Sequence, residues 1–169
     1  MIKAILAVDP WGGMGYKGSL PWPHCKEDLQ YFQNQTSGQI VVMGRKTWDD
    51  EKMPKPLPNR TTYVVTNRPI AGYGVTSISG NIKEHLLRIE KIYPHKTVWV
   101  IGGPQILMDC RSLFQEVHIS HFKNQYKTDT NIDLRKFLQF FQARSAKPSS
   151  NNVCTWMTYK NIDIFSPVL

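Results

Sequence analysis

Short apolar runs rich in β-branched residues recur along the chain, and stretches with a helical period separate them. Such runs are typical of strands that are buried on both faces of a sheet. The predicted strands are Ile2–Val8, Ile40–Met43, Tyr63–Thr66, Val98–Ile101 and Val117–Ser120. The predicted helices are Lys26–Gln35, a short one from Lys46, Ile82–Ile92 and Pro104–Cys110. This alternation favours a largely parallel sheet with helices on both faces.

The pattern changes towards the end of the chain. Phe140–Ala146 and Val153–Tyr159 are predicted strands, and a turn rich in Ser and Asn at Pro148–Asn152 joins them into an antiparallel hairpin. The sequence therefore predicts an α/β fold with a central mixed, mainly parallel sheet that ends in an antiparallel C-terminal hairpin. Its 169 residues suit one domain spanning residues 1–169, with no repeat or linker.

The charge of the chain limits the choice of partner only slightly. A net charge of +8 suits either nucleic acid or small ligands that carry several phosphates and carboxylates. The sequence contains no run of five like charges, no aromatic RNA-binding motif and no zinc-finger spacing. We therefore expect no nucleic-acid partner.

The cysteines and the apolar segments indicate a compartment. Cys25, Cys110 and Cys154 form an odd, widely spaced set that matches neither a disulfide framework nor a paired metal site. We expect no metal ion and a reducing, cytoplasmic location. The apolar start of the chain is too short for a secretory signal, and no apolar run approaches membrane-spanning length, so no membrane association is expected.

One predicted helix carries a carboxylate along an apolar stripe. Cys25, Asp28 and Phe32 follow one another at spacings of three and four, which places them on one helix face. A carboxylate on an apolar cleft wall can accept two parallel N–H bonds from a flat heterocycle such as a 2-amino-4-oxo-pteridine. An acidic residue here also suits a helix cap or a solvated edge, so Asp28 alone does not decide the function.

Two predicted strands end in glycine at the start of a helix. Gly44 precedes the cations Arg45 and Lys46, and the pair Gly102-Gly103 precedes a proline at the first helical turn. Such turns bring backbone N–H groups close to an anionic ligand. Each is equally compatible with surface cations or a plain tight turn, and neither matches a standard nucleotide-binding motif. Together with the carboxylate-bearing helix, they suit a dinucleotide and a second ligand in one crevice.

Four motifs in register give the chain a family resemblance. They are Leu20-Pro21-Trp22-Pro23 ahead of Asp28, Gly44-Arg45-Lys46-Thr47-Trp48, Pro56-Leu57-Pro58-Asn59-Arg60 and Ile101-Gly102-Gly103. In order and separation they resemble dihydrofolate reductase across nearly the whole chain. The resemblance implies reduction of dihydrofolate by hydride transfer from NADPH to C6 of the pterin, with N5 protonated by water.

The resemblance also implies roles for the residues around the substrate. Asp28 would hold and polarise the pterin ring without protonating N5, and Ser120, where threonine is usual, would hydrogen-bond its carboxylate. Trp22 would pack near the substrate and hold an ordered water. Arg60 would bind the α-carboxylate of the glutamate tail. The other residues implied for the substrate pocket are Ile5, Ala7, Leu20, Phe32, Leu57 and Ile101.

For the cofactor, the resemblance implies phosphate contacts from both glycine turns and a 2′-phosphate site after the third strand. The Gly102–Gly103 peptide bond is expected to be cis, and the segment Asp9–Pro23 is expected to close over the nicotinamide. The residues implied to bind NADPH are Ala7, Gly15, Ser19, Gly44, Arg45, Lys46, Thr47, Thr66, Asn67, Arg68, Ile101, Gly102, Gly103, Gln105, Ile106 and Leu107.

Three residues depart from the family pattern, and two other functions stay open. Leu107 lies where tyrosine is frequent, Pro104 where a small residue is common and Asn67 where some members have arginine. One alternative is a pyrimidine reductase of riboflavin synthesis, which shares the fold and NADPH but binds no glutamate tail. The other is a basic, non-catalytic module that binds nucleotide or nucleic acid. We expect the protein to act as a monomer.

Overall fold

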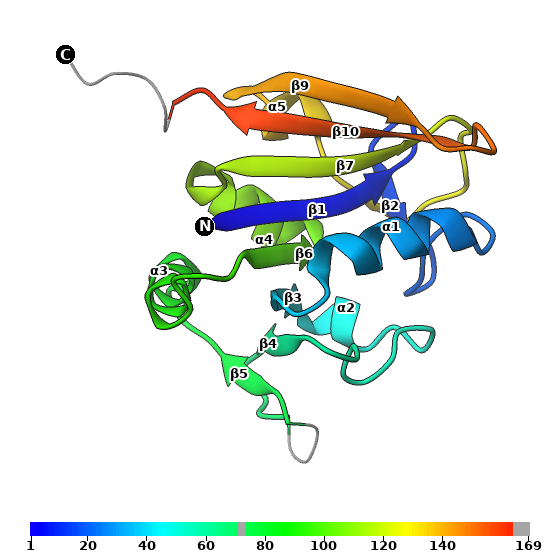
Figure 1. Ribbon diagram of the computed structural model, residues 1–169. Coiled ribbons are helices and arrows are strands. Elements are labelled where there is room, and N and C mark those ends of the chain that lie inside the picture. The colour runs from blue at the N-terminus through cyan, green and yellow to red at the C-terminus, as the bar shows by residue number, and fades with distance from the viewer. Residues whose placement is uncertain (71–73, 164–169) are drawn as a thin grey trace.

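An eight-stranded sheet forms the centre of the computed structural model, which describes residues 1–70 and 74–163. The strand order is β5-β4-β3-β6-β1-β7-β10-β9, and only the pairs that involve β10 are antiparallel (Figure 1). The strands of this sheet are β1 Ile2–Val8, β3 Ile40–Gly44, β4 Thr61–Val65, β5 Thr76–Ile78, β6 Val98–Gly102, β7 Glu116–Phe122, β9 Phe141–Pro148 and β10 Cys154–Asn161. The predicted mixed sheet with an antiparallel C-terminal hairpin is confirmed.

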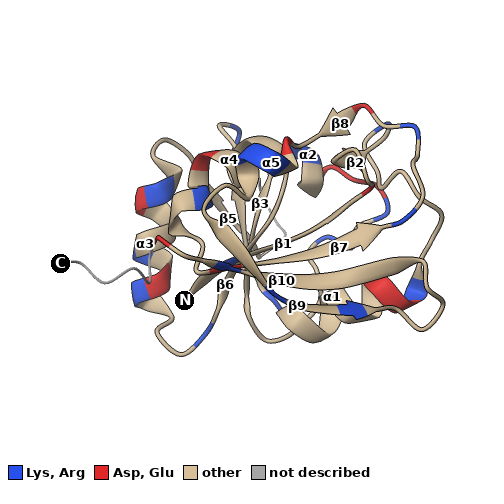
Figure 2. Ribbon diagram, turned by 90° about the horizontal axis from the view of Figure 1, so that it is seen from above, with Lys and Arg blue, Asp and Glu red and all other residues tan. Residues whose placement is uncertain are grey.

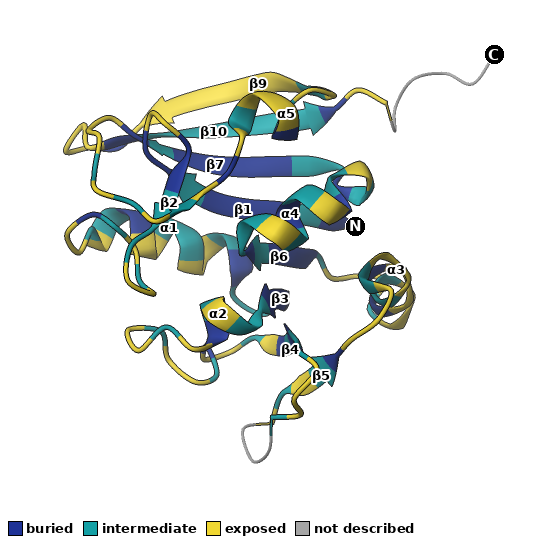
Figure 3. Cartoon of the chain, turned by 180° about the vertical axis from the view of Figure 1, so that it is seen from behind, coloured by how far each residue is buried: buried dark blue, intermediate teal, exposed yellow. Residues whose placement is uncertain are grey.

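Helices cover both faces of this sheet, because side chains alternate along each strand. Ile2, Ala4 and Leu6 of β1 face the main core, which includes Leu86 and Leu107 from two helices, whereas Ile5 faces a second core that includes Trp48. Figure 3 shows the inner strands as the buried part of the molecule. The helices are α1 Lys26–Thr36, α2 Arg45–Trp48, α3 Ile82–Ile92, α4 Pro104–Cys110, α5 Leu134–Phe137 and the 3-10 helix η1 Arg111–Leu113.

Most predicted elements lie where the hydrophobic pattern placed them, and the short ones are additions. The strand β1 and the helices α3 and α4 have the predicted bounds, and the other predicted elements differ by a few residues at their ends. The edge strand β5, the two short helices α5 and η1, and the pair β2 (Gly13–Gly15) and β8 (Thr130–Asn131) were not predicted. These elements have at most four residues, which is too short for a periodic pattern to emerge.

Lys and Arg are spread over helices and loops with acidic residues among them (Figure 2). In the described part of the chain, no helix is both long and apolar enough to cross a membrane.

The sheet directs several loops to one edge. Strands β1, β3, β6 and β7 run parallel, so their carboxyl ends meet at the same side of the molecule. This edge carries the segment Asp9–Pro23 after β1 and the glycine turns that follow β3 and β6. In open α/β sheets the crevice at the carboxyl ends of the strands is the usual place for a ligand.

Candidate active site

A cavity of about 360 Å³ opens between α1, β1 and the loop after α2. Its lining includes the three predicted catalytic residues, Trp22, Asp28 and Ser120. Of the predicted substrate residues, Arg60 is not part of the lining, and the others are: Ile5, Ala7, Leu20, Asp28, Phe32, Leu57 and Ile101. Residues from several separate segments of the sequence therefore meet at the cavity as predicted.

Asp28 is the buried carboxylate of this cavity and is only 7% exposed. It lies in the first turn of α1 but does not cap the helix. Its Oδ1 accepts a hydrogen bond of 2.6 Å from the Ser120 hydroxyl, as predicted, and a second one of 2.9 Å from the indole nitrogen of Trp156. All hydrogen bonds that Asp28 receives from described side chains end on Oδ1, so Oδ2 is the carboxylate oxygen left for a ligand.

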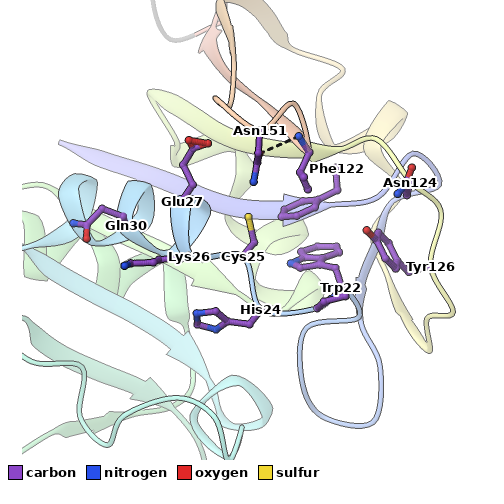
Figure 4. Close-up of a pocket in the computed structure, with 12 residues that line it drawn as sticks. Trp22, His24, Cys25, Lys26, Glu27, Gln30, Phe122, Asn124, Tyr126 and Asn151 are labelled. Carbon is purple, nitrogen blue, oxygen red and sulfur yellow. Dashed lines mark hydrogen bonds between the residues drawn. The ribbon is translucent and has the colours of Figure 1, made fainter.

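Trp22 lines the cavity, and its ring packs against two other aromatic rings. Its ring stacks on Phe122 at 4.0 Å with an angle of 13°, and Tyr126 meets it edge-on at 5.9 Å. Figure 4 shows these three rings together beside the start of α1, where His24 and Cys25 lead into the helix. Aromatic packing of this kind fixes the ring geometry, so Trp22 presents a constant surface to the cavity.

Hydrogen bonds fix the first half of the segment Asp9–Pro23. Asp9 is only 1% exposed, and its carboxylate accepts hydrogen bonds from the backbone N–H groups of Trp11, Gly13 and Tyr126 at 2.9, 2.8 and 3.2 Å. The strand β2, which contains Gly15, pairs with β8. Further along, the Ser19 hydroxyl donates to Asp50 at 2.8 Å and joins this segment to the loop after α2, across the cavity.

The two glycine turns lie in direct contact at the strand ends. A side chain at Gly44 would meet Cδ1 of Ile106 at 3.0 Å and the backbone nitrogen of Gly103 at 3.5 Å. The Gly102–Gly103 bond is cis, as expected, and Gly102 has a φ of +134°, which favours glycine. A side chain at Gly103 would meet no atom within 4 Å, so the surface beside this turn is open.

Cations surround the glycine turns on the side of β4. Arg45 pairs with Asp49 at 3.1 Å, and its Nη1 lies 3.3 Å from both the Thr66 hydroxyl and the Arg68 carbonyl oxygen. Arg45 therefore bridges the first glycine turn to the segment after β4, where Asn67 and Arg68 are exposed. Lys46 is exposed beside Thr47, which lines the cavity. The Gln105 side chain is bound to Asp109 at 3.0 Å.

Arg60 lies next to the cavity without lining it. Its Nε donates to the Pro58 carbonyl oxygen at 2.9 Å, its Nη1 lies 3.3 Å from the Thr36 hydroxyl, and its guanidinium covers the Phe32 ring at 5.8 Å. Because Phe32 lines the cavity, the guanidinium lies at the cavity rim with donors that these contacts leave free. The predicted contact with a substrate carboxylate stays a prediction.

Leu107 is corrected from a cofactor contact to a core residue. Its exposed fraction is 0%, and it packs in the main core beneath the sheet. This leucine, one helical turn after Gly103, faces inwards because α4 must bury an apolar side chain against the strands. Gln105 of the same helix is exposed, and Ile106 is half-buried at the edge of the main core.

Several residues of the site were missed by the sequence argument. The cavity lining also includes Leu29, Tyr31 and Met53, and Trp156 reaches Asp28 from β10. Leu29 and Tyr31 could have been inferred from the helical spacing around Asp28. Trp156 could not, since it is 128 residues away from Asp28 and only the pairing of β10 with β7 brings it there.

Comparison with known proteins gives one consistent result. The family model described as dihydrofolate reductase matches residues 1–161. The type 8 dihydrofolate reductase of Escherichia coli is 28% identical over 168 residues, which cover 96% of this chain and 97% of that protein. The dihydrofolate reductase of Bacillus subtilis is 32% identical over 132 residues, with 78% of this chain and 75% of that protein covered.

A solved structure has the same fold. The dihydrofolate reductase from Enterococcus faecalis, complexed with NADP(H) and RAB-propyl, superposes with a TM-score of 0.81 at 26% identity and covers 95% of this chain and 96% of that chain. The match of the family model over nearly all of the sequence, with the shared fold and the curated relatives, shows that the chain belongs to the dihydrofolate reductase family of oxidoreductases.

Proposed function

We propose that the protein reduces 7,8-dihydrofolate to 5,6,7,8-tetrahydrofolate with NADPH as the hydride donor. The observation that carries this proposal is Asp28, a buried carboxylate inside an otherwise largely apolar cavity, whose Oδ2 receives no hydrogen bond from the described side chains. A pteridine that carries a 2-amino group presents adjacent N–H groups on one edge. A carboxylate is the acceptor that such an edge requires.

The walls of the cavity suit a flat ring followed by an extended tail. Ile5, Phe32 and Leu57 offer apolar surface to both faces of a heterocycle. Arg60 lies on the Phe32 side of the rim, where a guanidinium can bind a carboxylate through two parallel hydrogen bonds. This combination of a ring site and a tail cation supports a folate and argues against a pyrimidine substrate of riboflavin synthesis.

The two glycine turns fit a dinucleotide phosphate. The missing side chain at Gly44 lets the two turns pack together, and the open surface beside Gly103 lets a phosphate approach the backbone closely. Arg45 and Arg68 suit the additional 2′-phosphate that distinguishes NADPH from NADH. The residues proposed to hold NADPH are those predicted from the sequence without Leu107. When bound, NADPH supplies the hydride that the reaction needs.

The residues of this chain orient the substrate and control access of water. Asp28 anchors and polarises the ring, and it does not itself donate a proton to N5. We infer that a water molecule protonates N5, because Asp28 lies at the far edge of the ring in this binding mode. Trp22, fixed against Phe122, limits the space for that water. The Ser19–Asp50 hydrogen bond holds the loop against the opposite side of the cavity.

A substrate comparison tests this proposal. NADPH oxidation, followed by absorbance, should be rapid with dihydrofolate and absent with the aminopyrimidine intermediate of riboflavin synthesis. Rapid oxidation with the aminopyrimidine alone would favour the alternative reductase. No oxidation with either substrate, together with salt-dependent binding of nucleic acid, would favour the non-catalytic binding module.

A further inference from the structure

The indole of Trp156 is a second hydrogen-bond donor to the carboxylate of the proposed site. Trp156 lies directly opposite Ser120 in the antiparallel register of β10 and β7, so both side chains project from the same face of the sheet. The Ser120 hydroxyl and the Trp156 Nε1 both donate to Oδ1 of Asp28, at 2.6 and 2.9 Å. Oδ1 therefore receives two donors of the described protein, whereas Oδ2 receives none of the described side-chain donors.

The plane of the Trp156 indole is set by a ring from α1. Tyr31, which follows Asp28 by one helical turn, stacks on Trp156 with ring centres 4.8 Å apart and an angle of 13°. The Tyr31 hydroxyl lies 3.4 Å from Nδ1 of His118, and the other ring nitrogen of His118 lies 3.0 Å from a Glu116 oxygen. Burial, and then the charge of Asp28, raise the pKa of Tyr31 to about 12, so its hydroxyl stays protonated.

The N-terminal turn of α1 is also joined to the hairpin that carries Trp156. Glu27 accepts hydrogen bonds from the backbone N–H and the hydroxyl of Ser150, at 2.7 and 2.5 Å. Ser150 lies in the turn between β9 and β10. Two contacts therefore fix the position of Trp156 relative to Asp28: Tyr31 stacks on the indole, and the Glu27–Ser150 hydrogen bonds join α1 to the hairpin.

We propose that Trp156 is a positioning residue for the substrate: with Ser120 it fixes the rotation of the Asp28 carboxylate, so that Oδ2 faces the cavity as the first acceptor for the bound ring. This inference rests on the proposed function. Without the indole N–H, the carboxylate is held by Ser120 alone and can rotate about its side-chain bond. The substrate must then restrict that rotation on binding, which weakens binding rather than the chemical step.

The test uses Trp156→Phe, which keeps a smaller aromatic ring against Tyr31 and removes the N–H donor. The KM for dihydrofolate should rise about tenfold, the effect of one charge-assisted hydrogen bond, while kcat changes by less than about threefold. The KM for NADPH should stay constant. Trp156→His can place a ring N–H at the position of the indole N–H, so its KM should lie between those of the wild type and Trp156→Phe.

Trp99→Phe is the matched control. Trp99 is 3% exposed, and its indole nitrogen has no hydrogen-bond partner in the described part of the protein. The same substitution at this position should leave the KM for dihydrofolate within about twofold of wild type, since no hydrogen bond of the indole nitrogen is lost. Thermal unfolding of each variant establishes that it is folded.

A second mutation separates positioning from general packing. In an Asp28→Ala background, Trp156→Phe should cause no further loss in kcat/KM, because its effect acts through the carboxylate. An equal loss with and without Asp28, or a wild-type KM in Trp156→Phe, would overturn the proposal. Turnover of dihydrofolate by the wild type tests the proposed function itself, so the two failures are distinguishable.

Discussion

Replacing Asp28 by asparagine should place a hydrogen-bond donor where the cavity now has an acceptor. Ser120 and Trp156 both donate a hydrogen bond to Oδ1 of Asp28. In the variant, the amide oxygen of asparagine would therefore occupy the position of Oδ1, and its NH₂ group would occupy the position of Oδ2. The opposite amide orientation would set the NH₂ group against two donors and lose two hydrogen bonds, each worth about 1 kcal/mol. The variant therefore presents a donor to a ligand edge that needs an acceptor.

The size of the effect follows from this reversal. An opposed or unsatisfied buried hydrogen bond costs about 1–3 kcal/mol, and the charge assistance is lost as well. At about 1.4 kcal/mol per factor of ten, kcat/KM for dihydrofolate near neutral pH should fall by at least tenfold and by up to about a hundredfold. NADPH binding, measured by fluorescence titration, should hardly change. Wild-type kcat/KM in Asp28→Asn would show that another acid holds the substrate.

Three further predictions concern the cofactor, the tail and the pH dependence of stability. The enzyme should prefer NADPH to NADH, and Arg45→Ala should reduce that preference, since Arg45 and Arg68 would face the 2′-phosphate; equal kcat/KM values for both cofactors in the wild type would contradict this. Arg60→Ala should weaken dihydrofolate binding by about tenfold to a hundredfold but leave a dihydropterin without the glutamate tail unaffected, and an equal loss for both would exclude a tail contact. Burial lowers the pKa of His121 below its ordinary 6.5, so the unfolded chain binds a proton more readily and the free energy of unfolding should decline as the pH falls below about 6.5. The variant His121→Gln keeps a hydrogen-bond partner for the Tyr159 hydroxyl but removes the titrating group. The difference between its urea unfolding midpoints at about pH 7.5 and pH 5.5 should be smaller than in the wild type. An unchanged difference would show that other groups cause the decline in stability.

The hydrophobic pattern was sufficient for the long elements because their periodicity is expressed over many residues. The seven residues of β1 are buried on both faces of the sheet and the eleven residues of α3 bury one helix face, and both segments were predicted with the observed bounds. The strand β5 has three residues at the edge of the sheet, where pairing with β4 and not burial decides the conformation. Its local sequence carries no comparable signal.

The cavity was predictable to the extent that its residues belong to recognisable motifs. The resemblance placed Asp28, Trp22 and Ser120 in one site, and the structure brings them together. It failed at Leu107, because a position near a ligand in some members is filled here by a side chain that turns into the core. It also gave no warning of Trp156, whose bond to Asp28 depends on strand register and on stacking with Tyr31.

The fate of the transferred hydrogen tests the proposed function most directly. Incubation of the protein with dihydrofolate and NADPH that carries deuterium at the reactive C4 position should yield tetrahydrofolate with one deuterium at C6, detected by mass spectrometry and NMR. This is the outcome expected if the cavity around Asp28 orients the pterin against the cofactor beside the glycine turns. Tetrahydrofolate without deuterium, or no product while NADPH still binds, would contradict the account.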